Sequence, residues 1–323
     1  MENPALNLTK PARLRKGDTV GIIAPASPSS HADALERSAA ALVKLGFKPK
    51  FATNVRARLG FLAGTDEGRA ADLMSLFADP EVRAIICLRG GYGCGRLLPL
   101  LDFEVIRRNP KIFVGYSDIT SLHCALQVKA NLVSFHAPML DAALAHPELP
   151  AFTLQSLLKT IMEPAPAGPL SAGAEPKTAV TLRGGRASGR LIGGNLSVLV
   201  TTLGTPWQPS FAGRIVFLED VDEKPYGYDR MLTHLGNAGV FQQVAGVAVG
   251  VNSNCLDPKA AEAKEYRQTL NDVLAERLGR LNVPVVRDLP FGHVPVNATL
   301  PIGIHATLDG DAAELIINEA AVT

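Results

Sequence analysis

The sequence predicts an α/β protein with two domains, and three observations support this prediction. In the first half, short apolar runs alternate with amphipathic stretches, the pattern of a parallel sheet covered by helices. The chain has 323 residues, about twice the usual length of one domain. Residues 163–177 read EPAPAGPLSAGAEPK, with no hydrophobic period, and are the expected linker. We therefore predict domains at 1–162 and 178–323.

The first domain is expected to alternate strands and helices along the chain. Its expected strands are 19–24, 48–52, 84–88, 112–116 and 132–136. Its expected helices are 32–44, 66–77, 103–108 and 119–129. Thr65 is a suitable cap for the second of these helices, and Asp66 would be an acid in its first turn.

The second domain is expected to be a smaller α/β unit with short strands. Residues 214–218 are an apolar strand that ends in acids, and 299–318 form short strands around a turn at Asp309 and Gly310. The expected helices are 196–203, 226–235 and 262–278. A Gly-rich stretch, 183–194, precedes the first of them.

Composition narrows the functional classes. Hydrophobic residues make up 47% and charged residues 20%, as in an ordinary globular enzyme. The formal net charge is +1 and there is no Lys/Arg run, so we expect no nucleic-acid partner. No stretch resembles a secretory signal or a membrane span. The four cysteines lack C-x-x-C spacing, which fits a reducing cytoplasm.

Ser117 is the first candidate for chemistry. An apolar strand runs into this serine and continues directly into a helix, which would expose the hydroxyl on a sharp turn. That geometry suits a nucleophile. An ordinary helix cap is the alternative, and the sequence lacks the second Gly of G-x-S-x-G.

A Gly-rich turn, 89–95, follows the preceding strand. Gly90 and Gly91 could let a backbone N–H approach a developing oxyanion, whereas a tight turn without a site is the structural alternative. Nucleotide binding has weaker support, because neither Rossmann spacing nor a Walker A sequence is present. Cys94 lies in this turn rather than at a strand-to-helix elbow, so it is a weaker nucleophile candidate than Ser117.

Glu219 and His293 are candidates for the acid and the base. Glu219 is the first of several acids after a buried-looking strand, although such clusters are often solvated strand ends. His293 lies between glycine and apolar residues, where it is either structural or an imidazole base that works near neutral pH. The remaining histidines are scattered without HExxH or Cys/His ligand spacing, so we expect no metal and no cofactor.

Five motifs together resemble the LD-carboxypeptidase family of serine peptidases, over about residues 17–308. They are LRGGYG at 88–93, GYSDIT at 115–120, LIGGNLSVL at 191–199, FLEDVDEKPYGYDRML at 217–232 and LPFGHV at 289–294. The resemblance implies a flavodoxin-like first domain and a triad of Ser117, His293 and Glu219 divided between the domains. It also implies a cytoplasmic, metal-free homodimer that releases terminal D-alanine from murein tetrapeptides in peptidoglycan recycling.

The expected mechanism has an oxyanion held by the backbone N–H of Asp118 and of Gly90 or Gly91. Candidates for gripping the muropeptide are Arg89, Tyr92, Asn195 and Arg230, for which surface or packing roles stay open. Two alternatives remain. One is a microcin-immunity-type peptidase that acts on peptidyl- or aminoacyl-nucleotides, and the other is a muropeptide-binding protein without catalysis.

Overall fold

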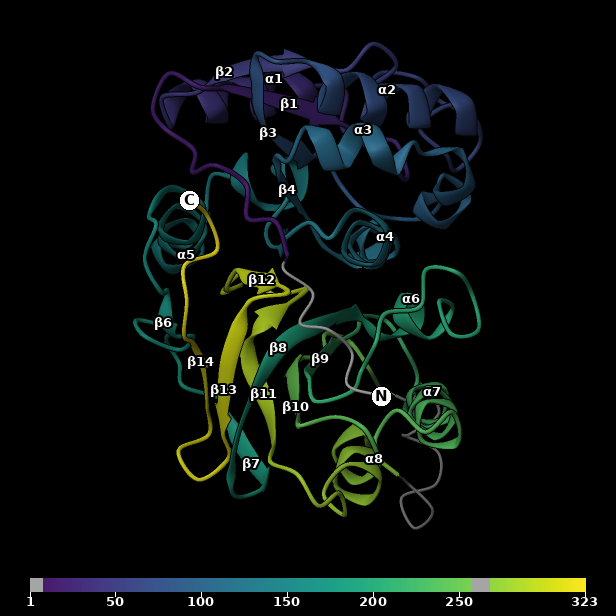
Figure 1. Cartoon of the computed structure of the whole chain (residues 1–323), viewed down its shortest axis with the longest axis vertical. Coiled ribbons are helices and arrows are strands. Elements are labelled where there is room, and N and C mark those ends of the chain that lie inside the picture. Colours follow the sequence, from purple (N-terminus) through teal and green to yellow (C-terminus); the bar gives the residue numbers. More distant parts are fainter. Residues whose placement is uncertain (1–7, 257–267) are drawn as a thin grey trace.

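The computed structural model describes residues 8–256 and 268–323, which form two sheets flanked by helices (Figure 1). The first sheet has six strands in the order β12-β5-β4-β3-β1-β2. The second has eight strands in the order β6-β14-β13-β8-β9-β10-β11-β7. The predicted α/β class with two sheet domains is confirmed.

The first sheet is parallel from β2 to β5 and has the flavodoxin-like order 2-1-3-4-5. Its central strands are buried along nearly their whole length, because helices cover both faces and leave no solvent side for polar residues. The strands are β1 (Thr19–Ile23), β2 (Lys48–Phe51), β3 (Val82–Cys87), β4 (Ile112–Gly115) and β5 (Ser134–His136).

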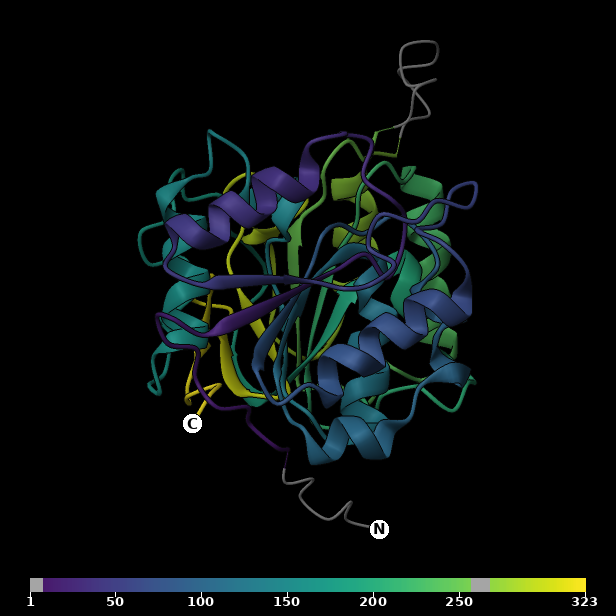
Figure 2. The same cartoon turned by 90° about the horizontal axis from the view of Figure 1, so that it is seen from above.

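The helices of the first half lie on both sides of this sheet, as the view from above shows (Figure 2). The predicted cap at Thr65 is confirmed, since its side chain accepts a hydrogen bond from the Gly68 N–H. A helix at Ala151–Met162, α5, had not been predicted. The others are α1 (Ala34–Lys44), α2 (Asp66–Ala78), α3 (Phe103–Arg108) and α4 (Thr120–Ala130).

The second sheet has a parallel centre, β8-β9-β10-β11, and antiparallel strands on both sides. The expectation of short strands is wrong for β8 (Arg186–Asn195), which has ten residues. Its first half pairs with β13 and its second half with β9, so one long strand joins both parts of the sheet. The other strands are β7 (Val180–Arg183), β9 (Ile215–Glu219), β10 (Gly246–Val251), β11 (Val285–Gly292), β13 (His305–Asp309) and β14 (Glu314–Ile317).

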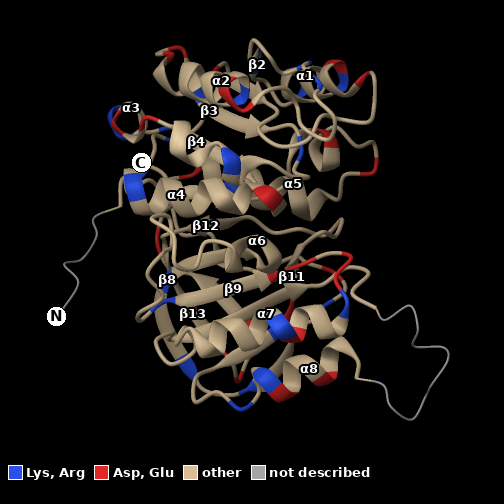
Figure 3. Ribbon diagram, turned by 90° about the vertical axis from the view of Figure 1, so that its right-hand side faces the viewer, with Lys and Arg blue, Asp and Glu red and all other residues tan. Residues whose placement is uncertain are grey.

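Three helices accompany this sheet in the described residues: α6 (Leu196–Val200), α7 (Pro225–Asn237) and α8 (Leu270–Arg277). The helix predicted at 262–278 is shorter, because a capping box between Thr269 and Asp272 starts it at Leu270. Residues 262–267 of that prediction lie outside the described residues. Figure 3 shows charges of both signs on α7 and α8.

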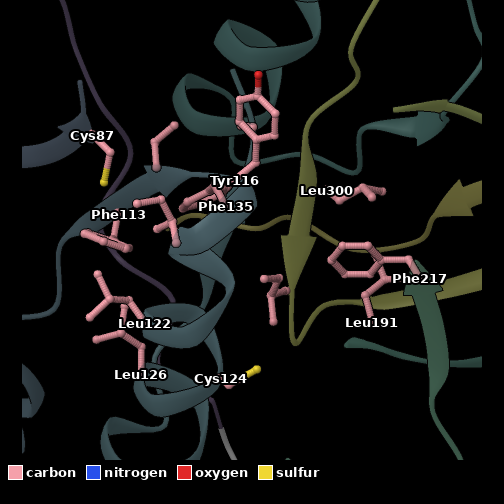
Figure 4. Packing of buried hydrophobic residues seen from close by; sticks show 14 of the residues in the cluster. Cys87, Phe113, Tyr116, Leu122, Cys124, Leu126, Phe135, Leu191, Phe217 and Leu300 are labelled. Carbon is pink, nitrogen blue, oxygen red and sulfur yellow. The ribbon is translucent and has the colours of Figure 1, made fainter. Parts of the chain in front are cut away.

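Two short strands connect the halves of the chain. β12 (Leu300–Ile302) comes from the second half but pairs antiparallel with β5 in the first sheet. β6 (Gly168–Pro169) lies inside the predicted linker and pairs with β14. Figure 4 shows Leu300 between Phe135 and Phe217, so buried side chains from both sheets meet at this boundary. In the described part of the chain, no helix has the length and hydropathy needed to span a bilayer.

Candidate active site

Ser117 lies in the turn between β4 and α4, at the carboxyl end of the first sheet. Its φ is 65°, a left-handed conformation that costs free energy for a residue with a side chain. The chain leaves β4 at Gly115 and enters helical turns at once, so the serine occupies a sharp strand-to-helix elbow. Such strain is typical of a nucleophile elbow.

The Gly-rich turn after β3 packs directly against Ser117. A Cβ atom on Gly90 would lie 3.0 Å from the Ser117 Cβ and 3.2 Å from its Oγ, so glycine permits this close approach. Gly91 has a φ of 117° and leaves room for Ser27. The N–H groups of Gly90 and Gly91 donate to no group among the described residues. The expected oxyanion role of these two N–H groups stays a prediction.

The side chain of Asp118 ties the elbow to the Gly-rich turn. Its Oδ2 accepts a hydrogen bond of 2.8 Å from the Cys94 N–H. Burial raises the pKa of the Asp118 carboxyl, although this bond opposes the shift. Burial also raises the pKa of the Cys94 thiol well above 9.0. A thiol that resists ionisation is a poor nucleophile, which weighs further against Cys94.

Glu219 and His293 form a close pair in the second sheet. His293 Nδ1 lies 2.7 Å from Glu219 Oε2, and the Glu219 side chain has no exposed surface. Glu219 ends β9, His293 follows β11, and β10 lies between these strands. The two side chains therefore meet over the end of the middle strand.

Glycines in the neighbouring strands permit this meeting. A Cβ atom on Gly250, in β10, would lie 2.4 Å from the Phe291 carbonyl oxygen and 2.6 Å from the Phe291 ring. Gly292 has a φ of 123°, and a Cβ there would lie 3.4 Å from Glu219 Oε2. The Ser253 hydroxyl donates to the His293 carbonyl oxygen over 2.7 Å, which fixes the backbone of the histidine.

Opposing influences act on the His293 ring. Desolvation lowers its pKa, but the Glu219 hydrogen bond and the charges of Glu219, Asp220 and Asp222 outweigh this, so its pKa is raised above 6.5. If Nδ1 carries the proton donated to Glu219, the lone pair is on Nε2. The pair can therefore act as an oriented base.

Tyr116 joins the two halves of the candidate site. Its ring centroid lies 4.7 Å from that of His293, and it directly precedes Ser117. No hydrogen bond joins Ser117 to His293 among the described residues. Both Tyr116 and His293 line a cavity of about 370 Å³. Tyr116 was not among the predicted site residues. Its position directly before the candidate nucleophile was the signal in the sequence that could have identified it.

The predicted substrate contacts lie in different environments. Both Arg89 and Tyr92 belong to the Gly-rich turn. Arg89 donates to the Pro28 carbonyl oxygen at 3.4 Å, and Tyr92 is 54% exposed. Asn195 is buried, caps α6 and donates to Asp220, so its hydrogen bonds are made within the protein. Arg230 is exposed on α7 over the Tyr226 ring. The described residues contain no group of three or more potential metal ligands.

Two family models match the two halves of the chain separately. Residues 20–137 match the LD-carboxypeptidase N-terminal domain, and residues 188–308 match the LD-carboxypeptidase C-terminal domain. The chain is 38% identical over 314 residues to a probable murein peptide carboxypeptidase of Bacillus subtilis, which covers 97% of this chain and 95% of that protein.

Solved structures show the same fold. A muramoyltetrapeptide carboxypeptidase from Oxalobacter formigenes superposes with a TM-score of 0.81 at 32% identity, over 94% of this chain and 100% of that one. The microcin C7 self-immunity protein, known from Escherichia coli, superposes with a TM-score of 0.86 at 26% identity, over 98% of this chain and 100% of that one.

Proposed function

The chain belongs to the LD-carboxypeptidase family, and we propose that it releases terminal D-alanine from murein tetrapeptides by cutting the L,D peptide bond. The observation that carries this proposal is the 2.7 Å contact between His293 and Glu219, with Tyr116 packing on His293 beside the strained Ser117. A nucleophile, a base and an acid orienting the base are the parts that a serine peptidase needs.

The proposed reaction proceeds through an acyl-enzyme. His293 Nε2 takes the proton of Ser117 as Oγ attacks the carbonyl carbon, and Glu219 stabilises the imidazolium. The oxyanion accepts hydrogen bonds from the N–H of Asp118 and of Gly90 or Gly91. The imidazolium then protonates the leaving D-alanine amine, and His293 activates a water that hydrolyses the ester.

A defined panel of muropeptides, analysed by mass spectrometry, tests this proposal. We expect D-alanine from the tetrapeptide, and little product from the D,D bond of the pentapeptide, from an all-L tetrapeptide or from a C-terminal amide. Inverting a centre displaces the reacting atoms, and about 1 Å can cost on the order of 10²-fold in rate. Comparable kcat/KM on the pentapeptide would contradict the L,D assignment. Activity should persist in a chelator.

A second candidate is hydrolysis of an aminoacyl-nucleotide. The TM-score of 0.86 to the microcin C7 self-immunity protein favours testing it. Preferential turnover of an aminoacyl sulfamoyl adenosine over every muropeptide would establish this alternative. Muropeptide binding without any turnover would indicate a non-catalytic protein.

The proposed enzyme acts as a homodimer on recycled wall fragments in the cytoplasm. Sedimentation of the full chain tests the dimer, and fractionation of the producing cells tests the location. A monomer with full activity would refute the dimer without touching the proposed reaction.

A further inference from the structure

The cavity beside His293 has a position that fits the leaving residue of the substrate. The same imidazole that activates Ser117 must also protonate the departing amine, so the leaving residue lies next to it. His293 and the segment after it, Val294, Pro295 and Asn297, line this cavity. A space that borders this imidazole can therefore hold the leaving residue.

The walls of the cavity are mainly apolar. The π-helix η4 (Leu140–Leu144) supplies Ala142 and Ala143, and π-helices are frequent at functional sites. Leu149 and Pro150 continue this wall, and Val294 and Pro295 lie in the lining from the other half of the chain. Small alanines leave the space open, and the apolar side chains favour apolar contacts. His146 and Glu148 also line the cavity and are exposed.

The volume is larger than alanine requires. Alanine carries only a methyl group as its side chain, whereas the cavity measures about 370 Å³. Pockets for small molecules start near 300 Å³. We propose that this cavity is the leaving-residue subsite and that it accepts D-residues with apolar side chains much larger than methyl. This inference rests on the proposed function.

Among the polar side chains that line the cavity, His146 and Glu148 are exposed, whereas Asn297 is buried. It is 3% exposed, and its Oδ1 accepts a hydrogen bond of 3.2 Å from the Gly292 N–H. Its Nδ2 has no hydrogen-bond partner among the described residues. Because Gly292 fixes the oxygen, the amide nitrogen remains free to donate to the carboxylate of the leaving residue.

Tetrapeptides that end in D-alanine, D-leucine or D-methionine test the size of the subsite. An apolar side chain that fills a pocket changes kcat/KM by roughly 10- to 200-fold per group, so we expect the larger residues to be released at least as well as D-alanine. Release of D-alanine with a lower kcat/KM for both larger residues overturns the subsite and leaves the proposed function intact. Release of none of the three overturns the proposed function.

Variants that fill the cavity with a larger side chain test whether it is the leaving-residue subsite. Ala143→Leu should lower kcat/KM for the D-leucine substrate at least tenfold and change that for D-alanine less than threefold. Ala142→Leu is a second variant if the first does not fold. Ala275→Leu, on the exposed face of α8, is the matched control. It should leave unchanged the ratio of kcat/KM for the D-leucine substrate to that for the D-alanine substrate. Equal losses on both substrates in the cavity variants would overturn the assignment.

Asn297→Asp tests the carboxylate contact. The variant keeps an acceptor for the Gly292 N–H but replaces the amide donor with a carboxylate oxygen. We expect KM for the free-acid peptide to rise by roughly 10- to 100-fold, with kcat little changed, because a hydrogen bond to a charged carboxylate is lost. The preference for the free acid over the C-terminal amide should fall in parallel. An unchanged preference would overturn the role of Asn297.

Discussion

The elbow of Ser117 and the pair of Glu219 and His293 are built in different ways. The elbow is local, because a few consecutive residues impose the left-handed turn and the Gly90 contact completes it. The pair joins residues 74 positions apart, across the end of a third strand. A local device depends on backbone conformation, whereas the pair depends on how closely three strands approach. The two regions should therefore fail in different ways when altered.

The largest effect is expected at the elbow itself. Ser117→Ala should lower kcat by up to roughly 10⁶-fold, and adding His293→Ala should cost little more, because residues acting as one unit are strongly non-additive. Rapid-quench assays on the single and double variants measure this. Losses that multiply would show that the two regions work separately. Cys94→Ala is the control and should retain turnover if its buried site tolerates the change.

Glu219→Gln should lower kcat by about 10⁴-fold, since the amide no longer orients and stabilises the imidazolium. It should also shift the titration of His293 to lower pH. Desolvation lowers that pKa, and the variant removes the main opposing cause. Imidazole NMR and the pH dependence of kcat/KM report the shift. A pKa that stays above 6.5 would contradict the paired role.

The same pair has a predictable effect on stability. The pKa of His293 is higher in the folded protein than its unfolded value of 6.5, so protonation of this residue stabilises the fold. This stabilisation is complete at pH values below 6.5 and is lost as the pH rises through the folded-state pKa. The stability difference between the native chain and Glu219→Gln should therefore be larger at pH 5 than at pH 9. Thermal unfolding at both values checks the sign.

Gly250→Ala should disturb the pair without touching either member. Its Cβ would overlap the Phe291 carbonyl, which must shift β11 and displace His293. We expect roughly 10²-fold lower kcat/KM. In Gly95→Ala, near the elbow, the added Cβ would lie 3.7 Å from Ser121 Oγ, with no other atom within 4 Å. This variant should have nearly unchanged kcat/KM. Similar activity in both variants would show that the close approach of β10 and β11 does not determine the geometry of Glu219 and His293.

The smallest effect concerns strain at the elbow. Ser117→Gly removes the left-handed penalty of about 1–2 kcal/mol, partly offset by the greater freedom of glycine in the unfolded chain. A small rise in the thermal midpoint is expected. Ser117→Ala keeps the side-chain penalty and should show no such rise. Equal midpoints in the two variants would mean that the elbow stores no strain.

The sequence predicted the first sheet well, because buried parallel strands leave continuous apolar runs such as 112–116, and β4 occupies Ile112–Gly115. It did not predict that Leu300 pairs with His136 or that Tyr116 packs on His293. Those contacts depend on which distant strands become neighbours. Local periodicity contains no such information, so the candidates could be named from their motifs but their meeting required the fold.

β12 also constrains how the protein is made. The edge of the first sheet at β5 stays unpaired during synthesis until residues 300–302 have left the ribosome, although the rest of that sheet was translated much earlier. Open strand edges invite aggregation, and contacts between distant segments slow folding. The nascent chain is therefore expected to depend on chaperones late in translation, and a prematurely terminated product would lack both a closed first sheet and, when cut before His293, its proposed base.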